Sequence, residues 1–132
     1  MITFKETKEF PAAQIAELFS SVEWESADDV PMLLRALANS TRVISAWDGE
    51  KLVGLIRSMD DGCWSATIDC LLVHKSYHGQ GIGSALVKRL LKQLSGVKYI
   101  SVAPNEPENI SFYERLGFFV VGGSRLLQII NL

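Results

Sequence analysis

Basic residues are not in excess in this sequence. Lysine and arginine together number 13 and aspartate and glutamate 15, which gives a formal net charge of -2 at pH 7. A protein that binds nucleic acid through its phosphates carries a basic patch or stripe. The composition therefore argues against a general nucleic-acid-binding protein.

Long apolar runs and cysteines are also scarce. No apolar run approaches the roughly 18 residues of a membrane span, and Met1–Glu9 is too polar for a signal peptide. We therefore expect a cytoplasmic protein without a membrane partner. Cys63 and Cys70 show no disulfide-framework spacing, so reduced thiols are expected. His74 and His78 have no cysteine or acidic partner at metal-ligand spacing, so no metal site is expected.

The apolar content suffices for one core. The chain has 132 residues, of which 48% are hydrophobic, so we expect a single domain over residues 1–132. Hydrophobic periodicity and turn signals predict an α+β fold with four helices and a mixed, mostly antiparallel sheet of about seven strands. The expected strands are Ile2–Lys5, Thr41–Trp47, Lys51–Met59, Trp64–Val73, Tyr99–Ala103, Phe118–Gly122 and Arg125–Asn131. The expected helices are Ala12–Phe19, a second from Asp28 or Asp29 to about Asn39, a third around Leu86–Leu94, and Pro107–Leu116.

Three closely spaced glycines, Gly79, Gly81 and Gly83, join an apolar strand to an amphipathic helix. Glycine allows a sharp turn and a close approach of another molecule, and the free amides and dipole of a helix start favour negative charge. The segment therefore predicts a phosphate-bearing ligand. A dinucleotide fingerprint fits poorly, and no Gly-Lys-Ser/Thr follows, which excludes a Walker A loop. The alternative is a glycine-rich turn that only connects two elements.

The same segment, from His78 to Gly83, resembles the acyl-CoA signature of the GNAT superfamily of N-acetyltransferases, Gln/Arg-x-x-Gly-x-Gly/Ala. His78 stands where that family usually has Gln or Arg. The resemblance implies that backbone amides hold the pyrophosphate and pantetheine of acetyl-CoA. The implied cofactor contacts are Leu71, Leu72, Val73, His78, Gly79, Gln80, Gly81, Ile82, Gly83 and Ser84. This half of the chain is most similar to small single-domain members that include aralkylamine-type acetyltransferases.

A second segment, Asn109–Phe118, resembles the late Phe-Tyr-Glu-Lys-Leu-Gly-Phe block of that superfamily. The resemblance implies that Tyr113 lies near the CoA sulfur as general acid and that Phe112 contacts the cofactor. Asn105 and Asn109 both match the CoA-contacting asparagine, and Asn109 is preferred. Without the glycine segment, Tyr113 would be interpreted as an aromatic packing residue.

The resemblance extends over the chain from end to end and implies a sheet that is splayed between its fourth and fifth strands. In this family the acetyl group passes directly to the amine in that gap. Thr67, Asp69 and Leu71 share one strand face by period two, so Asp69 is the candidate general base. The alternative is a solvated or structurally paired carboxylate. Cys70 faces the other way and lacks a histidine outside the cofactor loop, which disfavours covalent catalysis.

An acidic segment lies between the first two predicted helices. It contains Glu23, Trp24, Glu25, Asp28 and Asp29, a combination that suits a cationic amine. The alternative is a set of helix caps in a solvated loop.

The sequence as a whole predicts an N-acetyltransferase that uses acetyl-CoA as cosubstrate, needs no metal, and acetylates a primary amine of a small molecule. One alternative is acetylation of a protein or peptide amine. Another is a non-catalytic acyl-CoA-binding regulatory module. The sequence allows a homodimer.

Overall fold

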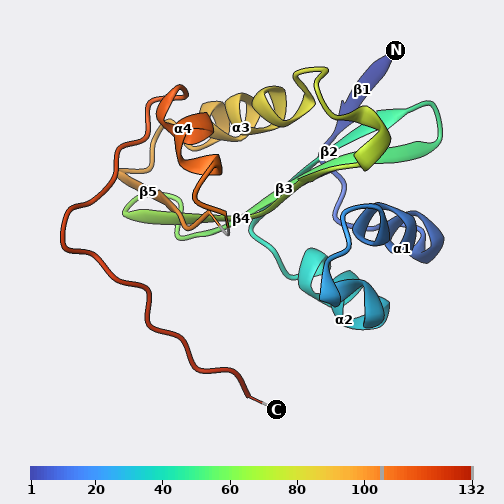
Figure 1. Cartoon of the computed structure of the whole chain (residues 1–132), viewed down its shortest axis with the longest axis horizontal. Coiled ribbons are helices and arrows are strands. Elements are labelled where there is room, and N and C mark those ends of the chain that lie inside the picture. Colours follow the sequence, from blue (N-terminus) through green and yellow to red (C-terminus); the bar gives the residue numbers. More distant parts are fainter. Residues whose placement is uncertain (105, 132) are drawn as a thin grey trace. The chain divides into compact units, whose positions relative to one another are not determined.

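The computed structural model describes residues 1–104 and 106–131, without the side chains of residues 25 and 26. The chain divides into two units, Met1–Val102 and Ala103–Leu132. The first unit holds the sheet and the three longer helices (Figure 1). Its elements are β1 (Ile2–Lys5), α1 (Ala12–Ser21), the 3-10 turn η1 (Glu25–Asp28), α2 (Val30–Ala38), β2 (Arg42–Asp48), β3 (Lys51–Asp60), β4 (Ser65–Val73), the 3-10 turn η2 (Lys75–Tyr77), α3 (Ile82–Gln93) and β5 (Tyr99–Val102).

The five strands lie in the sheet in chain order, β1-β2-β3-β4-β5. All neighbours are antiparallel except β4 and β5, which run parallel because the chain crosses over through α3. Between β2 and β3, Asp48 pairs with Lys51, and Gly49 adopts a positive φ of 61°, which suits the tight turn that joins the two expected strands. The prediction of a mixed, mostly antiparallel sheet is confirmed.

Strands β4 and β5 pair only over the first four residues of β4. Their register begins at Ser65 opposite Tyr99 and ends at Ile68 opposite Val102, where β5 stops. Strand β4 continues to Val73. Within the described residues, its second half thus has no strand neighbour on this side of the sheet, at the place where the family resemblance implies that the two strands part.

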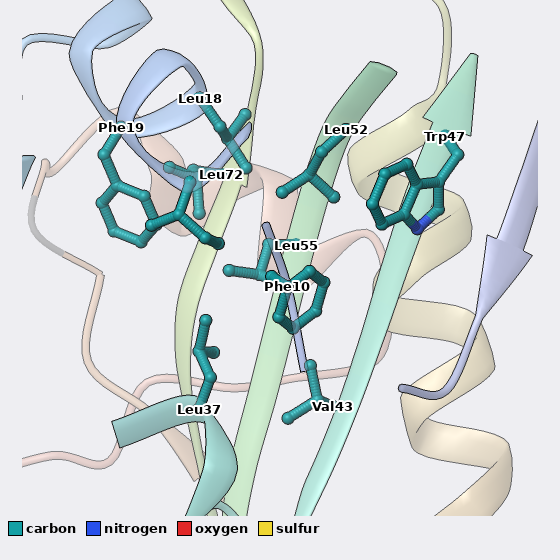
Figure 2. Close-up of a cluster of buried hydrophobic side chains, with 10 residues drawn as sticks. Phe10, Leu18, Phe19, Leu37, Val43, Trp47, Leu52, Leu55 and Leu72 are labelled. Atoms are coloured by element: carbon teal, nitrogen blue, oxygen red, sulfur yellow. The ribbon is translucent and has the colours of Figure 1, made fainter. Parts of the chain in front are cut away.

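One face of this sheet is covered by α1 and α2 and the other by α3 (Figure 1). The core beneath α1 and α2 is formed by apolar side chains at helical and alternating spacing (Figure 2). Its members are Phe10, Ile15, Leu18, Phe19, Leu37, Val43, Trp47, Leu52, Leu55 and Leu72. On the opposite face, α3 packs so closely on β3 that a Cβ at Gly54 would lie 3.0 Å from Leu86 Cδ1. The core therefore fixes the position of α3 on the sheet.

The second unit contains α4 (Asn109–Glu114), which is shorter than the predicted helix Pro107–Leu116. It is followed by Gly117 at a φ of 101°. The predicted strands Phe118–Gly122 and Arg125–Asn131 are wrong, because these residues form no strand and the sheet of the described chain has five strands rather than about seven. A β pattern makes a strand only when another strand supplies hydrogen-bond partners.

Within the described residues, no helix is both long and apolar enough to cross a membrane.

Candidate cofactor site

A bulge interrupts β4 immediately after its pairing with β5 ends. The register of β3 and β4 shifts between Leu55 and Arg57, so that Ile56 lies opposite two residues, Cys70 and Leu71. Cys70 has a positive φ of 55°, a conformation that normally belongs to glycine in this type of bulge. A bulge bends the strand and redirects its backbone amides. We call these two residues the β4 bulge.

The candidate base, Asp69, is bound on both carboxylate oxygens. Arg57 Nη2 donates to Asp69 Oδ2 at 2.9 Å, and the amide of Cys70 donates to Asp69 Oδ1 at 2.7 Å. Arg57 Nη1 also donates to Ser40 Oγ at 3.3 Å, which ties the pair to the end of α2. The structure thus favours the paired carboxylate over the free base. Sequence analysis missed Arg57, whose partner depends on strand register.

The environment of Cys70 keeps its thiol protonated. Burial raises the pKa of the Cys70 thiol, the charge of Asp69 raises it further, and the guanidinium of Arg57 opposes them. A thiol is nucleophilic only as the thiolate. The raised pKa agrees with the prediction that Cys70 does not form a covalent intermediate.

The loop after β4 is held by its two histidines. His74 is buried, and its Nδ1 accepts a hydrogen bond from the amide of Ser76 at 3.1 Å. His78 Nε2 lies 2.7 Å from the carbonyl oxygen of Val73 and must be the donor, because a carbonyl only accepts. The imidazole of His78, which the sequence assigns to cofactor contact, therefore closes its own loop.

The start of α3 is open to an approaching ligand. Gly79 and Gly81 have φ values of 80° and 79°, and a Cβ on either would meet no atom within 4 Å. The first bond of the helix runs from the Ala85 amide to Gly81 O at 3.0 Å. The amides of residues 82–84 precede this ladder and, with the helix dipole, favour an anion. We call residues 79–84 the glycine turn.

The predicted cofactor contacts lie along the second half of β4 and the glycine turn. Two are buried, namely Leu72 and Ile82. Four are half-buried, namely Leu71, Val73, Gly83 and Ser84, and four are exposed, namely His78, Gly79, Gln80 and Gly81. The buried residues fix the backbone, and the exposed ones leave it accessible.

Two contacts that sequence analysis missed hold the loop against the sheet and α1. The hydroxyl of Tyr77 donates to Asp48 Oδ2 at 2.6 Å, and this bond raises the pKa of Tyr77. His74 Nε2 lies 3.3 Å from Glu17 Oε2 and carries the hydrogen, since Nδ1 is an acceptor. Neither pair can be predicted from local sequence, because each joins residues that lie far apart in the chain.

In the second unit, Tyr113 is buried, with 7% of its surface exposed. Its ring meets those of Phe112 and Phe118 edge to face, at centroid distances of 5.0 and 5.5 Å. Phe112 is half-buried, and Asn109 is exposed at the first position of α4. Asn105, the other candidate asparagine, lies outside the described residues.

The acidic segment between α1 and α2 is partly structural. Asp29 caps α2, with Oδ1 accepting the amide of Met32 at 3.2 Å. Trp24 packs edge to face on Phe19 at 5.9 Å instead of forming an open surface. The side chain of Glu25 lies outside the described residues. Asp29 is therefore a helix cap, as the alternative interpretation of this segment predicts.

Among the side chains that the structure describes, no three of His, Cys, Asp or Glu are grouped as metal ligands.

Comparison with known proteins shows the family to which this fold belongs. The model of the acetyltransferase (GNAT) family matches residues 8–118. The "uncharacterized N-acetyltransferase ycf52" of Pyropia yezoensis is 31% identical over 110 residues, which are 80% of this chain and 63% of that protein. The chain thus spans less than two thirds of this relative's length.

Solved structures agree over nearly the whole chain. A GNAT family protein of Streptococcus pneumoniae has a TM-score of 0.84 at 32% identity, covering 99% of this chain and 98% of that one. An aminoglycoside 6'-N-acetyltransferase complexed with coenzyme A has a TM-score of 0.74 at 18% identity, covering 91% and 86%, and shows the fold alone. The fold of the described chain is therefore an acetyltransferase fold. The chain belongs to the GNAT family.

Proposed function

We propose that this protein transfers an acetyl group from acetyl-CoA directly to a primary amine of a small molecule. The observation that carries the proposal lies within the first unit. There the open glycine turn follows the stretch of β4 that has parted from β5. The coenzyme A complex of the structural neighbour supports the choice of cosubstrate.

The residues of the first unit fit an acyl-CoA. The amides of the glycine turn would hold the pyrophosphate, since they point out of a helix start that has no side-chain cap. The amides of Leu71 to Val73 would hold the pantetheine arm by strand-like hydrogen bonds on the free side of β4. Together these groups would place the thioester beside the β4 bulge.

The chemistry is a direct acyl transfer. The amine nitrogen forms a bond to the thioester carbon, the carbon–sulfur bond breaks, the amine loses a proton, and the departing sulfur gains one. Backbone amides of β4 would stabilise the oxyanion. Tyr113 is the proposed donor of the proton to sulfur. No atom of the protein is acetylated in this scheme.

The remaining expectations stay predictions. They are a cytoplasmic location, a single domain, a homodimer, and no partner among nucleic acids or membranes.

A thiol-release screen tests the activity. Acetyl-CoA is offered with primary amines, amino acids, aminoglycosides and peptides, and free CoA thiol is measured. We expect release with at least one small amine. Release with peptides alone would move the assignment to protein acetylation. Binding without release for any acceptor would favour a non-catalytic module.

Heat protection tests the cofactor separately. A ligand at 100 times its dissociation constant stabilises the folded state by about 2.7 kcal/mol. We therefore expect acetyl-CoA to raise the melting temperature of the wild type. Gly81→Asp should remove this shift, because it puts bulk and negative charge where the pyrophosphate approaches. Gly62→Asp is the matched control, since Gly62 also has a positive φ and open space and lies outside the site. An unchanged melting temperature of the wild type at millimolar acetyl-CoA contradicts the assignment.

A further inference from the structure

The β4 bulge depends on a residue in an unfavourable conformation. Cys70 has a φ of 55°, which only glycine adopts at little cost, and apart from Glu23 it is the only non-glycine among the described residues with positive φ. An isolated strand would relax this residue to an extended conformation and erase the bulge. Something in the surrounding structure must therefore hold it.

Asp69 supplies the holding contact. Its Oδ1 accepts the amide hydrogen of the next residue, Cys70, at 2.7 Å, and this bond fixes the peptide that enters the bulge. A carboxylate that is 55% exposed would otherwise move freely in water. Its second oxygen, however, is bound by Arg57 at 2.9 Å from the directly opposite position on β3.

Arg57 is itself anchored. Its Nη1 donates to Ser40 Oγ, and the same hydroxyl donates to the carbonyl of Ala36 in α2 at 2.7 Å. The Nε of Arg57 is buried without a hydrogen-bond partner among the described residues, which disfavours stability. Stability alone therefore does not explain an arginine at this position.

We infer that Arg57 and Asp69 are positioning residues that hold Cys70 left-handed and thereby set the β4 amides at the thioester. The effect on the thioester rests on the proposed function, whereas the contacts of Asp69 with Arg57 and the Cys70 amide do not. It replaces the role of general base for Asp69. A base would have to exchange a proton with the amine, whereas a positioning carboxylate keeps both oxygens on Arg57 and the Cys70 amide.

The substitution Cys70→Gly distinguishes a positioning role of Asp69 from a role as general base. Asp69→Ala removes the clamp, that is, the contacts of Asp69 with Arg57 and the Cys70 amide. We expect the single-turnover rate to fall by up to about 100-fold, as for a small misplacement of catalytic groups. Adding Cys70→Gly removes the strain, so the Asp69→Ala/Cys70→Gly double variant should regain the rate of Cys70→Gly alone. The control Asp69→Ala/Cys70→Ala also lacks the thiol, but alanine keeps the strain, so its rate should stay low.

A readout that needs no activity follows the contact itself. Hydrogen exchange of the Cys70 amide, measured by NMR on the protein without ligand, should be faster in Asp69→Ala than in the wild type. The proposed function fails if the wild type transfers no acetyl group, and this exchange then still reports on the clamp. An unchanged exchange rate or an unchanged turnover in Asp69→Ala would overturn the inference. An Asp69→Ala/Cys70→Gly variant that stays as slow as Asp69→Ala would also overturn it. That result would fit a general base, because glycine at position 70 cannot restore a lost base.

Discussion

The phenol of Tyr113 lies within an aromatic group of its own unit, beside Phe112 and Phe118. Tyr113→Phe keeps the ring and its packing and removes only the hydroxyl. If that hydroxyl protonates the departing sulfur, turnover should fall by about 100- to 10,000-fold, the usual contribution of general acid catalysis. The dissociation constant of acetyl-CoA should change little, because the lost interaction belongs to the transition state.

Single-turnover acetyl transfer is the measurement, since slow product release would hide the effect in steady state. Phe118→Leu is a control for aromatic packing alone, since Phe118 packs on the ring of Tyr113. A Tyr113→Phe variant with the wild-type single-turnover rate would reduce Tyr113 to a packing residue.

The two cysteines should differ in reactivity. Cys63 is exposed, whereas Cys70 is half-buried and its burial raises the pKa of its thiol above that of an unfolded chain. Alkylation of Cys63→Ser, which retains Cys70, should therefore be slower than alkylation of Cys70→Ser. Because the pKa is raised in the folded state, the rate for Cys70 should keep rising with pH beyond the range in which an unfolded thiol levels off. Equal rates in the folded variants would contradict this, and urea should abolish the difference.

At the scale of elements, Asp29 decides between two interpretations of the acidic segment. As the cap of α2 it accepts the amide of Met32, so Asp29→Ala should lower the free energy of unfolding by about 1 kcal/mol. Asp28→Ala is the matched control within η1, and its effect on stability should be small. Urea denaturation measures both. If Asp29→Ala left stability intact but raised the Michaelis constant for cationic amines, the segment would bind the acceptor instead.

The strands and helices of the first unit could be predicted because local signals and tertiary packing agree there. Asp48-Gly49 specifies a tight turn, and Pro11 precedes a helix with one apolar face. The segment after Gly117 carries an equally clear β pattern but forms no strand, since the pattern gives the propensity and not the partner.

The candidate site was predictable to a similar extent. The glycine turn follows from chain-local spacing and is where the sequence places it. The contact of Arg57 with Asp69 could not be predicted, because it requires the register of β3 on β4. That register contains a bulge whose key position holds cysteine, so the glycine that usually marks such a bulge is missing.

At the scale of the whole molecule, the segment after α4 exposes an unusual number of large apolar side chains. They are Phe119, Val120, Val121, Leu126, Leu127, Ile129 and Ile130, all more than 60% exposed. Exposed apolar side chains gathered in one segment point to an interaction site. We propose that a second copy of this chain covers it, and a net charge of only -2 gives little repulsion between copies.

Sedimentation velocity tests this homodimer. The wild type should show a dimer whose share grows with concentration. Leu127→Ser, Ile129→Ser and Ile130→Ser combined should give a monomer, because they remove much of the apolar surface. Met32→Ser with Trp64→Ser removes exposed apolar side chains elsewhere and should leave the dimer intact. A wild type that is monomeric at all concentrations would refute the proposal.

The order of the strands in the sheet has a kinetic consequence. Strands β2, β3 and β4 follow one another through short turns, so their two hairpins can form early, within about 1–10 μs each. The parallel pairing of β4 with β5 must wait until the crossover through α3 closes, and this crossover contains the glycine turn. A ligand held by the proposed site can therefore bind only after β4 and β5 have paired. Acetyl-CoA bound to the folded protein should slow unfolding. Acetyl-CoA present during refolding should leave the rate of the early phase unchanged.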